Sequence, residues 1–355
     1  MSTLVDGRPL QTYSAYRGIG RYVRHIARIF GLDDRVGFLF FREDNLSANV
    51  STPVFTASPR RMITMTDPYF LRKIFARHRT TCYHSTAYAL PGNVRNVRYL
   101  LTVFDLTPLK FPHFFPLRHR LVFKRIIESA KRADIVLPIS QTTASDLFDF
   151  VPIDPARIRV LHCMLDERLT GAAAEKPATS LPGDYLLYTG GADRVKNLET
   201  LFQAVSLLQI PLLIAGEIAE TRMNQLLSGL PLRDRRLVTF MGYVPDAHLA
   251  YLYSHAAAFV FPSLNEGFGF PPLESTQCGT PSVVSRAGSL AEILGDSVLY
   301  VDHPLDPGEW AGRIGNLLED SELRKELINR GRRLLPKYSR AEFEKNLKNI
   351  YFESD

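Results

Sequence analysis

The apolar runs and amphipathic stretches of the chain alternate in a way that predicts short buried strands separated by helices. Such alternation is typical of βαβ units, which build a parallel sheet. The apolar runs of the second half are nearly continuous, as expected for strands that helices cover on both faces. For residues 1–170 we expect strands at 3–5, 36–41, 81–85, 99–105, 135–139 and 158–161, and helices at 20–30, 68–78, 118–133 and 142–150.

A stretch rich in small residues and proline, at 167–183, interrupts the alternation and is typical of an interdomain linker. With 355 residues, the chain is also long for a single core. We therefore predict an α/β fold with two Rossmann-like, doubly wound parallel-sheet domains facing each other across a cleft. The predicted parts are a first domain at 1–170, a second at 171–335, and a C-terminal helix at 336–355 that packs back on the first domain.

In the second half, we expect strands within the runs YLLYTG, PLLIAG, LVTFMGY, AAFVFPS, PSVVS and SVLYV. Helices are predicted at 197–208, at 246–255, from Pro271 onward, and in the charged amphipathic region 320–353. Ligands of doubly wound sheets bind beyond the carboxyl ends of the strands. The functional residues are therefore expected in the loops that follow strands.

The composition is that of an ordinary globular protein, with 45% hydrophobic and 23% charged residues. No apolar run approaches the roughly 18 residues of a membrane span. The N-terminus lacks the basic start and apolar run of a secretory signal. Three cysteines without paired spacing suggest a reducing compartment and no zinc module. These features predict a cytoplasmic protein.

The positive charge is concentrated in the first half of the chain. Residues 1–170 hold 25 Lys and Arg against 14 Asp and Glu, whereas the rest holds 18 against 23. Two basic stretches with interleaved apolar residues lie at 69–79 and 117–132. They predict peripheral contact with an anionic membrane at its inner face, although a solvated basic face explains them equally well. Nucleic acid is the weakest partner hypothesis, because aromatic stacking platforms are missing from these helices.

The segment PSLNEGFGFPPLES, at 262–275, is the strongest chemical signal in the sequence. It follows an apolar strand and combines a glycine loop with a helix that proline opens, which is a favourable setting for a phosphate. Glycines allow backbone N–H groups to approach an anion closely. The carboxylates of Glu266 and Glu274 flank the loop, and each can accept two hydrogen bonds from vicinal hydroxyls of a sugar.

A second segment, YTGGADRVKNLETL at 188–201, places two cations beside a helix start at the end of a strand. Lys196 and Arg194 are therefore candidates to bind a diphosphate, with Asn197 as the predicted helix cap. Gly190 and Gly191 give the loop its close backbone approach. A solvated basic turn is the alternative explanation, and for Arg194 it is about as probable as the diphosphate clamp.

The first half offers weaker candidates. Gly18 and Gly20 precede a predicted helix in the string GIGRYV, where Arg21 adds a positive charge. His84 and Asp105 are each expected at a strand end and are candidates for catalysis. A lone histidine in such a loop is also often a structural hydrogen-bonding residue.

The EGFGFPPLE segment, with two glutamates seven residues apart, resembles glycosyltransferase family 4, which has the GT-B fold and retains the anomeric configuration. The resemblance is specific at about 185–302 and diffuse at 1–170. It implies that Glu266 contacts the hydroxyls of the donor sugar and that Glu274 holds the ribose. It also implies that the backbone of Gly267, Phe268 and Gly269 faces the sugar and diphosphate.

The same resemblance assigns further donor contacts. Lys196 and Arg194 would neutralise the leaving diphosphate without any metal, and the Gly18–Gly20 loop would line the cleft opposite the phosphates. Main-chain groups of Gly242, Tyr243 and Val244 would read the base, and Glu292 would support the donor loop. Two positions depart from the family pattern. Phe104 replaces a common histidine before Asp105, and Gly191 stands where an arginine often follows the first glycine.

The resemblance predicts a retaining hexosyltransferase, most similar to mannosyltransferases that use GDP-mannose and need no cofactor. The acceptor would be a saccharide or lipid-linked saccharide in the synthesis of a bacterial surface polysaccharide. A UDP-sugar donor stays open. A non-catalytic nucleotide-sugar-binding module is a second alternative, suggested by Phe104. A NAD-dependent oxidoreductase is excluded, because no GxGxxG follows the first predicted strand.

Overall fold

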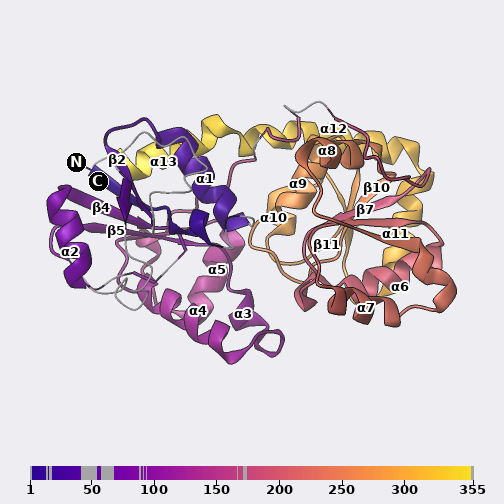
Figure 1. Cartoon of the computed structure of the whole chain (residues 1–355), viewed down its shortest axis with the longest axis horizontal. Coiled ribbons are helices and arrows are strands. Elements are labelled where there is room, and N and C mark those ends of the chain that lie inside the picture. Colours follow the sequence, from indigo (N-terminus) through magenta and orange to yellow (C-terminus); the bar gives the residue numbers. More distant parts are fainter. Residues whose placement is uncertain are drawn as a thin grey trace. The chain divides into compact units, whose positions relative to one another are not determined.

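The computed structural model of the chain describes residues 2–12, 15, 18–40, 54–56, 68–87, 89, 90, 92, 94–165, 167–170 and 174–352. The chain divides into two compact units, one of residues 1–164 with 340–355 and one of residues 165–339 (Figure 1). The divisions at 164/165 and 339/340 fall within a few residues of the predicted domain limits.

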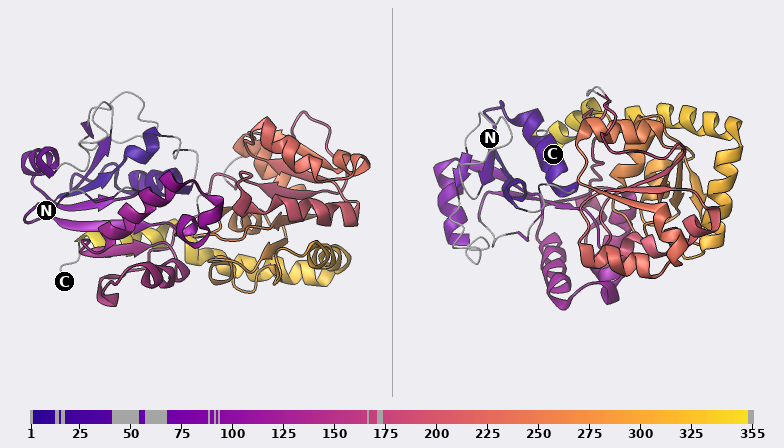
Figure 2. Two further views of the ribbon diagram at one scale, coloured as in Figure 1. Left: turned by 90° about the horizontal axis from the view of Figure 1, so that it is seen from below. Right: turned by 45° about the vertical axis from the view of Figure 1, so that its right-hand side comes forward.

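The first unit is built on a parallel sheet of six strands within the described residues, in the order β3-β2-β1-β4-β5-β6. Each strand pairs in parallel with its neighbours, and helices lie on both sides of the sheet (Figure 2). A strand at 158–161 was predicted wrongly, since only Ile158 forms a single bridge, to Val136. The strands are β1 Ser2–Asp6, β2 Val36–Phe40, β3 Val54–Thr56, β4 Thr80–Ser85, β5 Arg98–Val103 and β6 Ile135–Pro138.

The predicted helices of the first unit lie close to their predicted positions. The pattern did not predict α3, the strand β3 or the short 3-10 helices. The helices are α1 Gly18–Phe30, α2 Pro68–Arg77, α3 Thr107–Lys110, α4 Leu117–Ala130, α5 Gln141–Phe150 and α13 Arg340–Phe352, with 3-10 helices at Arg8–Gln11, Pro112–Phe114 and Pro155–Arg157.

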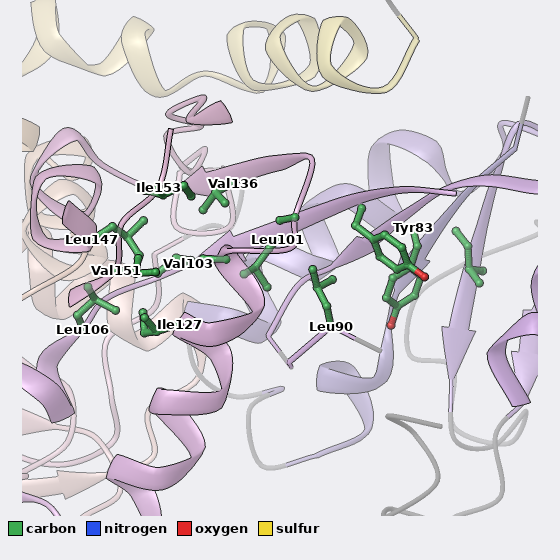
Figure 3. Close-up of a cluster of buried hydrophobic side chains, with 14 of the residues drawn as sticks. Tyr83, Leu90, Leu101, Val103, Leu106, Ile127, Val136, Leu147, Val151 and Ile153 are labelled. Atoms are coloured by element: carbon green, nitrogen blue, oxygen red, sulfur yellow. The ribbon is translucent and has the colours of Figure 1, made fainter. Parts of the chain in front are cut away.

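Buried apolar side chains fill the space between this sheet and its helices. Tyr83 and Leu101 from the strands pack in one cluster with Ile127 of α4 and Leu147 of α5 (Figure 3). All four are almost completely buried. The apolar runs read from the sequence therefore supply the core that holds the strand ends in place.

The C-terminal helix α13 belongs to the first unit and lies beside α1 (Figure 1). Phe343 of α13 packs edge-to-face on Tyr22 of α1, with ring centroids 5.7 Å apart. Arg98 of β5 donates a hydrogen bond of 2.6 Å to the carbonyl of Ile350. The predicted helical region 320–353 consists of two helices, α12 (Ser321–Leu334) and α13, separated by a 3-10 turn at Leu335–Tyr338.

The second unit contains another parallel sheet, with six strands in its described part in the order β12-β11-β10-β7-β8-β9. Each predicted strand is present, whereas the helices α7, α10 and α11 were not predicted. The strands are β7 Leu186–Thr189, β8 Leu212–Ala215, β9 Val238–Gly242, β10 Ala258–Phe261, β11 Ser282–Ser285 and β12 Leu299–Val301. The helices are α6 Leu198–Leu208, α7 Glu220–Ser228, α8 Asp246–His255, α9 Phe270–Gln277, α10 Leu290–Leu294, α11 Pro307–Glu319 and α12 Ser321–Leu334, with 3-10 helices at Arg194–Lys196 and Leu232–Leu237.

Candidate functional site

Two of the predicted site residues meet at the carboxyl ends of the neighbouring strands β7 and β10. Lys196 follows β7 and Glu266 follows β10, and these strands pair in parallel. The Lys196 Nζ atom lies 2.5 Å from Glu266 Oε1, and both side chains are partly buried. A parallel sheet places the ends of adjacent strands together, so residues 70 positions apart form one ion pair.

The position of Lys196 is set by the loop that carries it. Its backbone N–H donates to the carbonyl of Asp193 within the 3-10 turn. The next residue, Asn197, takes a left-handed conformation with φ 54°. Its side-chain amide donates to the carbonyls of Pro262 and Pro304, which ties this loop to the one after β10. Asn197 does occupy the N-cap position of α6, but its side chain makes no capping hydrogen bond, contrary to our expectation.

Glycines bring the backbones of three strand-end loops into contact. A Cβ atom at Gly216 would lie 2.2 Å from the carbonyl oxygen of Gly190, and both residues have positive φ angles. The N–H of Gly216 donates to the carbonyl of Gly242 at 2.8 Å. Gly191 has open space around its Cα, and its carbonyl accepts a hydrogen bond from the Tyr188 hydroxyl. Sequence reasoning missed Gly216, although a glycine directly after the run PLLIA was the available signal.

The backbone of Glu266 is held by the loop between β11 and α10. Ser289 donates two hydrogen bonds to the Glu266 carbonyl, one from its N–H at 2.9 Å and one from its hydroxyl at 3.0 Å. A Cβ atom at Gly288 would lie 2.5 Å from the N and O atoms of Glu266. Gly288 and Ser289 are positioning residues that the sequence did not reveal, because main-chain support depends on tertiary contacts.

The glycine loop after Glu266 leads directly into α9. Gly269 precedes the helix with φ 93°, and a Cβ atom there would lie 2.5 Å from a methyl of Leu290. Phe268 is buried against Phe270, so this part of the loop faces the core through its side chain. Gly267 is partly exposed. This loop therefore presents backbone and not a large side chain at the strand end.

Glu274 lies in α9 and is buried, with 3% of its surface exposed. Its Oε1 accepts a hydrogen bond of 2.6 Å from Arg168, and its Oε2 accepts one of 3.1 Å from the Tyr253 hydroxyl. Burial, and then the Glu274 charge, raise the pKa of Tyr253 well above its ordinary value, so this hydroxyl stays protonated and can donate. Arg168 also pairs with Asp246. No sequence signal pointed to Arg168 or Tyr253.

The predicted catalytic role of His84 does not fit its position in the structure. His84 is completely buried in the first unit, with Nδ1 2.6 Å from the Tyr351 hydroxyl and Nε2 2.7 Å from the Thr102 hydroxyl. Burial lowers the pKa of His84 to about 3, so the ring is neutral near pH 7. Both ring nitrogens serve the fold, and we do not retain His84 as a catalytic candidate.

The other first-unit candidates have local roles in the structure. Asp105 is partly exposed, and its Oδ1 accepts a hydrogen bond of 2.8 Å from the Thr107 N–H at the start of α3. The ring of Phe104 packs edge-to-face on Tyr22 at 5.3 Å. Gly18 begins α1 and Gly20 lies in its first turn, so the helix starts two residues before the predicted position 20. A ligand role for Asp105 stays a prediction.

The remaining predicted donor contacts lie at the ends of β7 and β9. Arg194 is exposed and makes no ion pair with the described residues. Tyr243 is 71% exposed, whereas Val244 is buried. Glu292 lies in the first turn of α10, whose preceding loop holds Glu266. No group of three metal-ligating side chains occurs among the residues that the structure describes.

The two parallel sheets, each doubly wound by helices, together with the strand-end loops described above, define the GT-B class of glycosyltransferases. Two family models cover most of the chain: "Glycosyltransferase Family 4" matches residues 16–169, and "Glycosyl transferases group 1" matches residues 173–334. The chain belongs to glycosyltransferase family 4, as predicted from the EGFGFPPLE segment.

Known relatives and solved structures agree with this assignment. The O-antigen chain mannosyltransferase B of Escherichia coli is 33% identical over 70% of this chain and 68% of its own length. The O-antigen chain mannosyltransferase RfbU of Salmonella typhimurium is 28% identical over 61% of this chain and 60% of its own. The solved sucrose-phosphate synthase of Thermosynechococcus elongatus has a TM-score of 0.77 at 23% identity, over 99% of this chain and 98% of that one.

The chain is therefore a glycosyltransferase. Among the described residues, no helix is both long and apolar enough to cross a membrane.

Proposed function

We propose that this glycosyltransferase transfers mannose from GDP-mannose, with retention, to a saccharide or lipid-linked saccharide in the synthesis of a bacterial surface polysaccharide. The names of the two O-antigen mannosyltransferase relatives support the sugar and the pathway class. The contact between Lys196 and Glu266 carries the proposal for the site. This pair combines one cation and one carboxylate, the groups needed for a diphosphate and a sugar, at the ends of two neighbouring strands.

In this proposal, the donor lies along the carboxyl edge of the second sheet. Glu266 accepts hydrogen bonds from the sugar hydroxyls, and Glu274 accepts them from the ribose. Lys196 and the N-terminus of α9 face the diphosphate, where positive charge is most favourable. The backbone of Gly242 to Val244 reads the base. In this arrangement, the Lys196–Glu266 pair would lie at the junction of sugar and diphosphate.

The reaction needs positioning and charge stabilisation more than covalent chemistry by the protein. The bond between the anomeric carbon and the diphosphate oxygen breaks, and the acceptor oxygen bonds to the same face of that carbon. The acceptor's proton passes to the departing diphosphate. Lys196, with Arg194 nearby on the same 3-10 turn, stabilises the negative charge that develops on this leaving group.

A panel of nucleotide sugars without added metal tests the donor. We expect GDP-mannose to raise the melting temperature of the protein, and Glu266→Gln to reduce that shift. A rise with UDP-sugars alone would replace the proposed donor by the UDP-sugar alternative. Donor consumption in the presence of an oligomannose acceptor then separates an enzyme from a binding module. The Phe104 departure from the family pattern makes that second measurement necessary.

We also propose that α4 contacts an anionic membrane surface. Leu117, Leu121 and Val122 of this helix are 64%, 51% and 53% exposed, which is unusual for large aliphatic side chains. Exposed cations are interleaved with them, and none forms an ion pair within the described part of the chain. An amphipathic surface of this kind favours a bilayer interface with negative headgroups. We call it the α4 surface, and it consists of Leu117, Arg118, Leu121, Val122, Lys124 and Arg125.

A further inference from the structure

Arg168 joins two elements of the proposed donor site through a single side chain. Its Nη2 donates to Glu274 Oε1 in α9 at 2.6 Å, and its Nη1 contacts Asp246 Oδ1 in the first turn of α8. Helix α8 directly follows the 242–244 segment proposed to read the base. Helix α9 carries the proposed ribose carboxylate. The guanidinium therefore connects the base end of the proposed site to its ribose end.

Glu274 needs such a partner because its carboxylate is taken almost entirely out of water. The side chain is 4% exposed, whereas that of Arg168 is 25% exposed. Burying an ionised carboxylate is unfavourable unless a cation and further hydrogen bonds compensate for the lost water. Arg168 supplies the cation on Oε1, and Tyr253 supplies a hydrogen bond on Oε2.

The planar fork of arginine suits this bridge. The two terminal nitrogens of one guanidinium reach two carboxylates, which a lysine ammonium cannot do with the same fixed angle. Asp246 is 45% exposed, so its pairing alone would contribute little to stability. It does fix the second nitrogen of Arg168, and with it the direction from which the first approaches Glu274.

We propose that Arg168 is a positioning residue for nucleotide binding, which holds the Glu274 carboxylate in the orientation that accepts the 2′- and 3′-hydroxyls of the donor ribose. This inference rests on the proposed function, because it takes Glu274 as the ribose-binding group. Arg168 lies outside the glycine loops, where the chain enters the second unit. Arg168 contacts no donor atom in this proposal and acts through Glu274.

The test compares nucleoside diphosphates with and without ribose hydroxyls, using isothermal titration calorimetry on the full chain. The probes are GDP and 2′,3′-dideoxy-GDP, or the uridine pair if UDP binds more tightly. We expect the native protein to prefer the ribose form by about tenfold or more, the scale of hydrogen bonds to a charged group. Arg168→Gln should abolish this preference by weakening the ribose form, and Arg168→Lys should restore part of it.

The matched control is Arg330→Gln, which removes another partly buried arginine of the second unit that pairs with Glu326 and Asp296. It should keep the native preference. A purely structural role would lower the melting temperature of Arg168→Gln and leave the ratio of the two affinities unchanged, which would overturn the inference. If Arg168→Gln bound the ribose form more tightly than the native protein does, the inference would also be overturned, because Arg168 would then compete with the donor.

Two outcomes separate this inference from the proposal beneath it. If the native protein prefers the ribose form and Glu274→Gln keeps that preference, another group binds the ribose. The proposed role of Arg168 is then wrong, whereas the proposal that the protein binds a nucleotide is still supported. If the native protein binds neither GDP nor UDP, the proposed function itself is wrong, and the inference falls with it.

Discussion

At the scale of single residues, the site combines a partly buried ion pair with residues that hold the backbone of that pair in place. Lys196 presents its positive charge at a strand end and donates a hydrogen bond to Glu266. Gly288 and Ser289 hold the backbone of Glu266 from the neighbouring loop. These roles differ in what a substitution should change. A lost charge should affect turnover, whereas a lost support should affect turnover and stability together.

Replacing Lys196 by Met should lower kcat by about 10²–10³, the scale found when one group that stabilises developing negative charge is removed. Its ion pair is partly exposed, so the free energy of unfolding should change by about 1 kcal/mol or less. Steady-state kinetics and urea denaturation measure both effects. Lys325→Met removes an exposed pair with Glu322 and should change neither quantity. An unchanged kcat in the Lys196 variant would refute the role at the diphosphate.

Gly288→Ala should reduce activity by distorting Glu266. The residue has φ 56°, and a Cβ atom would lie 2.5 Å from the Glu266 backbone, so we expect a loss of about 1–3 kcal/mol in stability as well. Gly312→Ala is the matched control, since open space surrounds that helical glycine in α11 and alanine is favoured in helices. Equal melting temperatures and activities for both variants would contradict the proposed support of Glu266.

The burial of His84 predicts that the stability of the protein depends on pH. The pKa of His84 is about 3 in the folded protein and about 6.5 when unfolded, so the unfolded chain binds the extra proton between these values. Its contribution is present above about pH 6.5 and declines as the pH falls, by on the order of 1.4 kcal/mol per unit. Denaturation of the native protein and His84→Gln at pH 7.5 and 5 tests this. The difference between them should shrink at pH 5, and parallel pH profiles would exclude the effect.

At the scale of elements, α4 packs on the first unit through its C-terminal part. Of its 14 residues, Ile127, Ser129 and Ala130 are buried, all near its C-terminal end. The remainder of the helix is not needed for the core. An element that keeps aliphatic side chains in water is expected to have a function at that surface.

Replacing Leu121 and Val122 of the α4 surface by Ser should weaken binding to vesicles that contain anionic lipid, because the buried apolar area falls. Vesicle cosedimentation should show a loss of about tenfold, with the melting temperature unchanged. Leu207→Ser in α6 removes a leucine of the second unit that is 64% exposed, and this variant should bind vesicles as the native protein does. Equal loss in both variants, or none in the first, would rule out the α4 surface.

At the scale of the whole molecule, the chain returns from the second unit to complete the first. Helix α13 is distant in sequence from the sheet it covers, yet it supplies Phe343 against Tyr22 and the Tyr351 hydroxyl against His84. The first unit is therefore formed from both ends of the chain. Its stability should depend on the last residues as much as on the first.

Phe343→Ala should open the first unit selectively. The side chain is 3% exposed, and removing such a phenylalanine costs about 3–5 kcal/mol. Hydrogen exchange followed by mass spectrometry should show faster exchange in peptides from residues 1–164 than in those from 165–339. Leu327→Ala, buried in α12, should give the opposite pattern. Identical patterns in the two variants would show that the units do not unfold separately.

The sequence alone determined the class of fold, because strand and helix periodicities and glycine loops are local properties of the chain. For the same reason it placed Lys196 and Glu266 after predicted strands, where the structure brings their side chains together; their roles in donor binding stay predictions. The failures share a physical cause. The segment 158–161 is apolar enough for a strand, but only one bridge forms there, and the number of partners depends on the neighbouring strand.

Tertiary structure decided which groups those residues meet. His84 lies at the end of a strand as expected, yet α13, more than 250 positions away, buries it. Arg168, Tyr253 and Gly288 act on the glutamates through contacts between distant segments, which no local pattern encodes. Periodicity and spacing record the interactions of a residue with its own element. The partners of a side chain are set by packing, and packing is defined only when the elements come together.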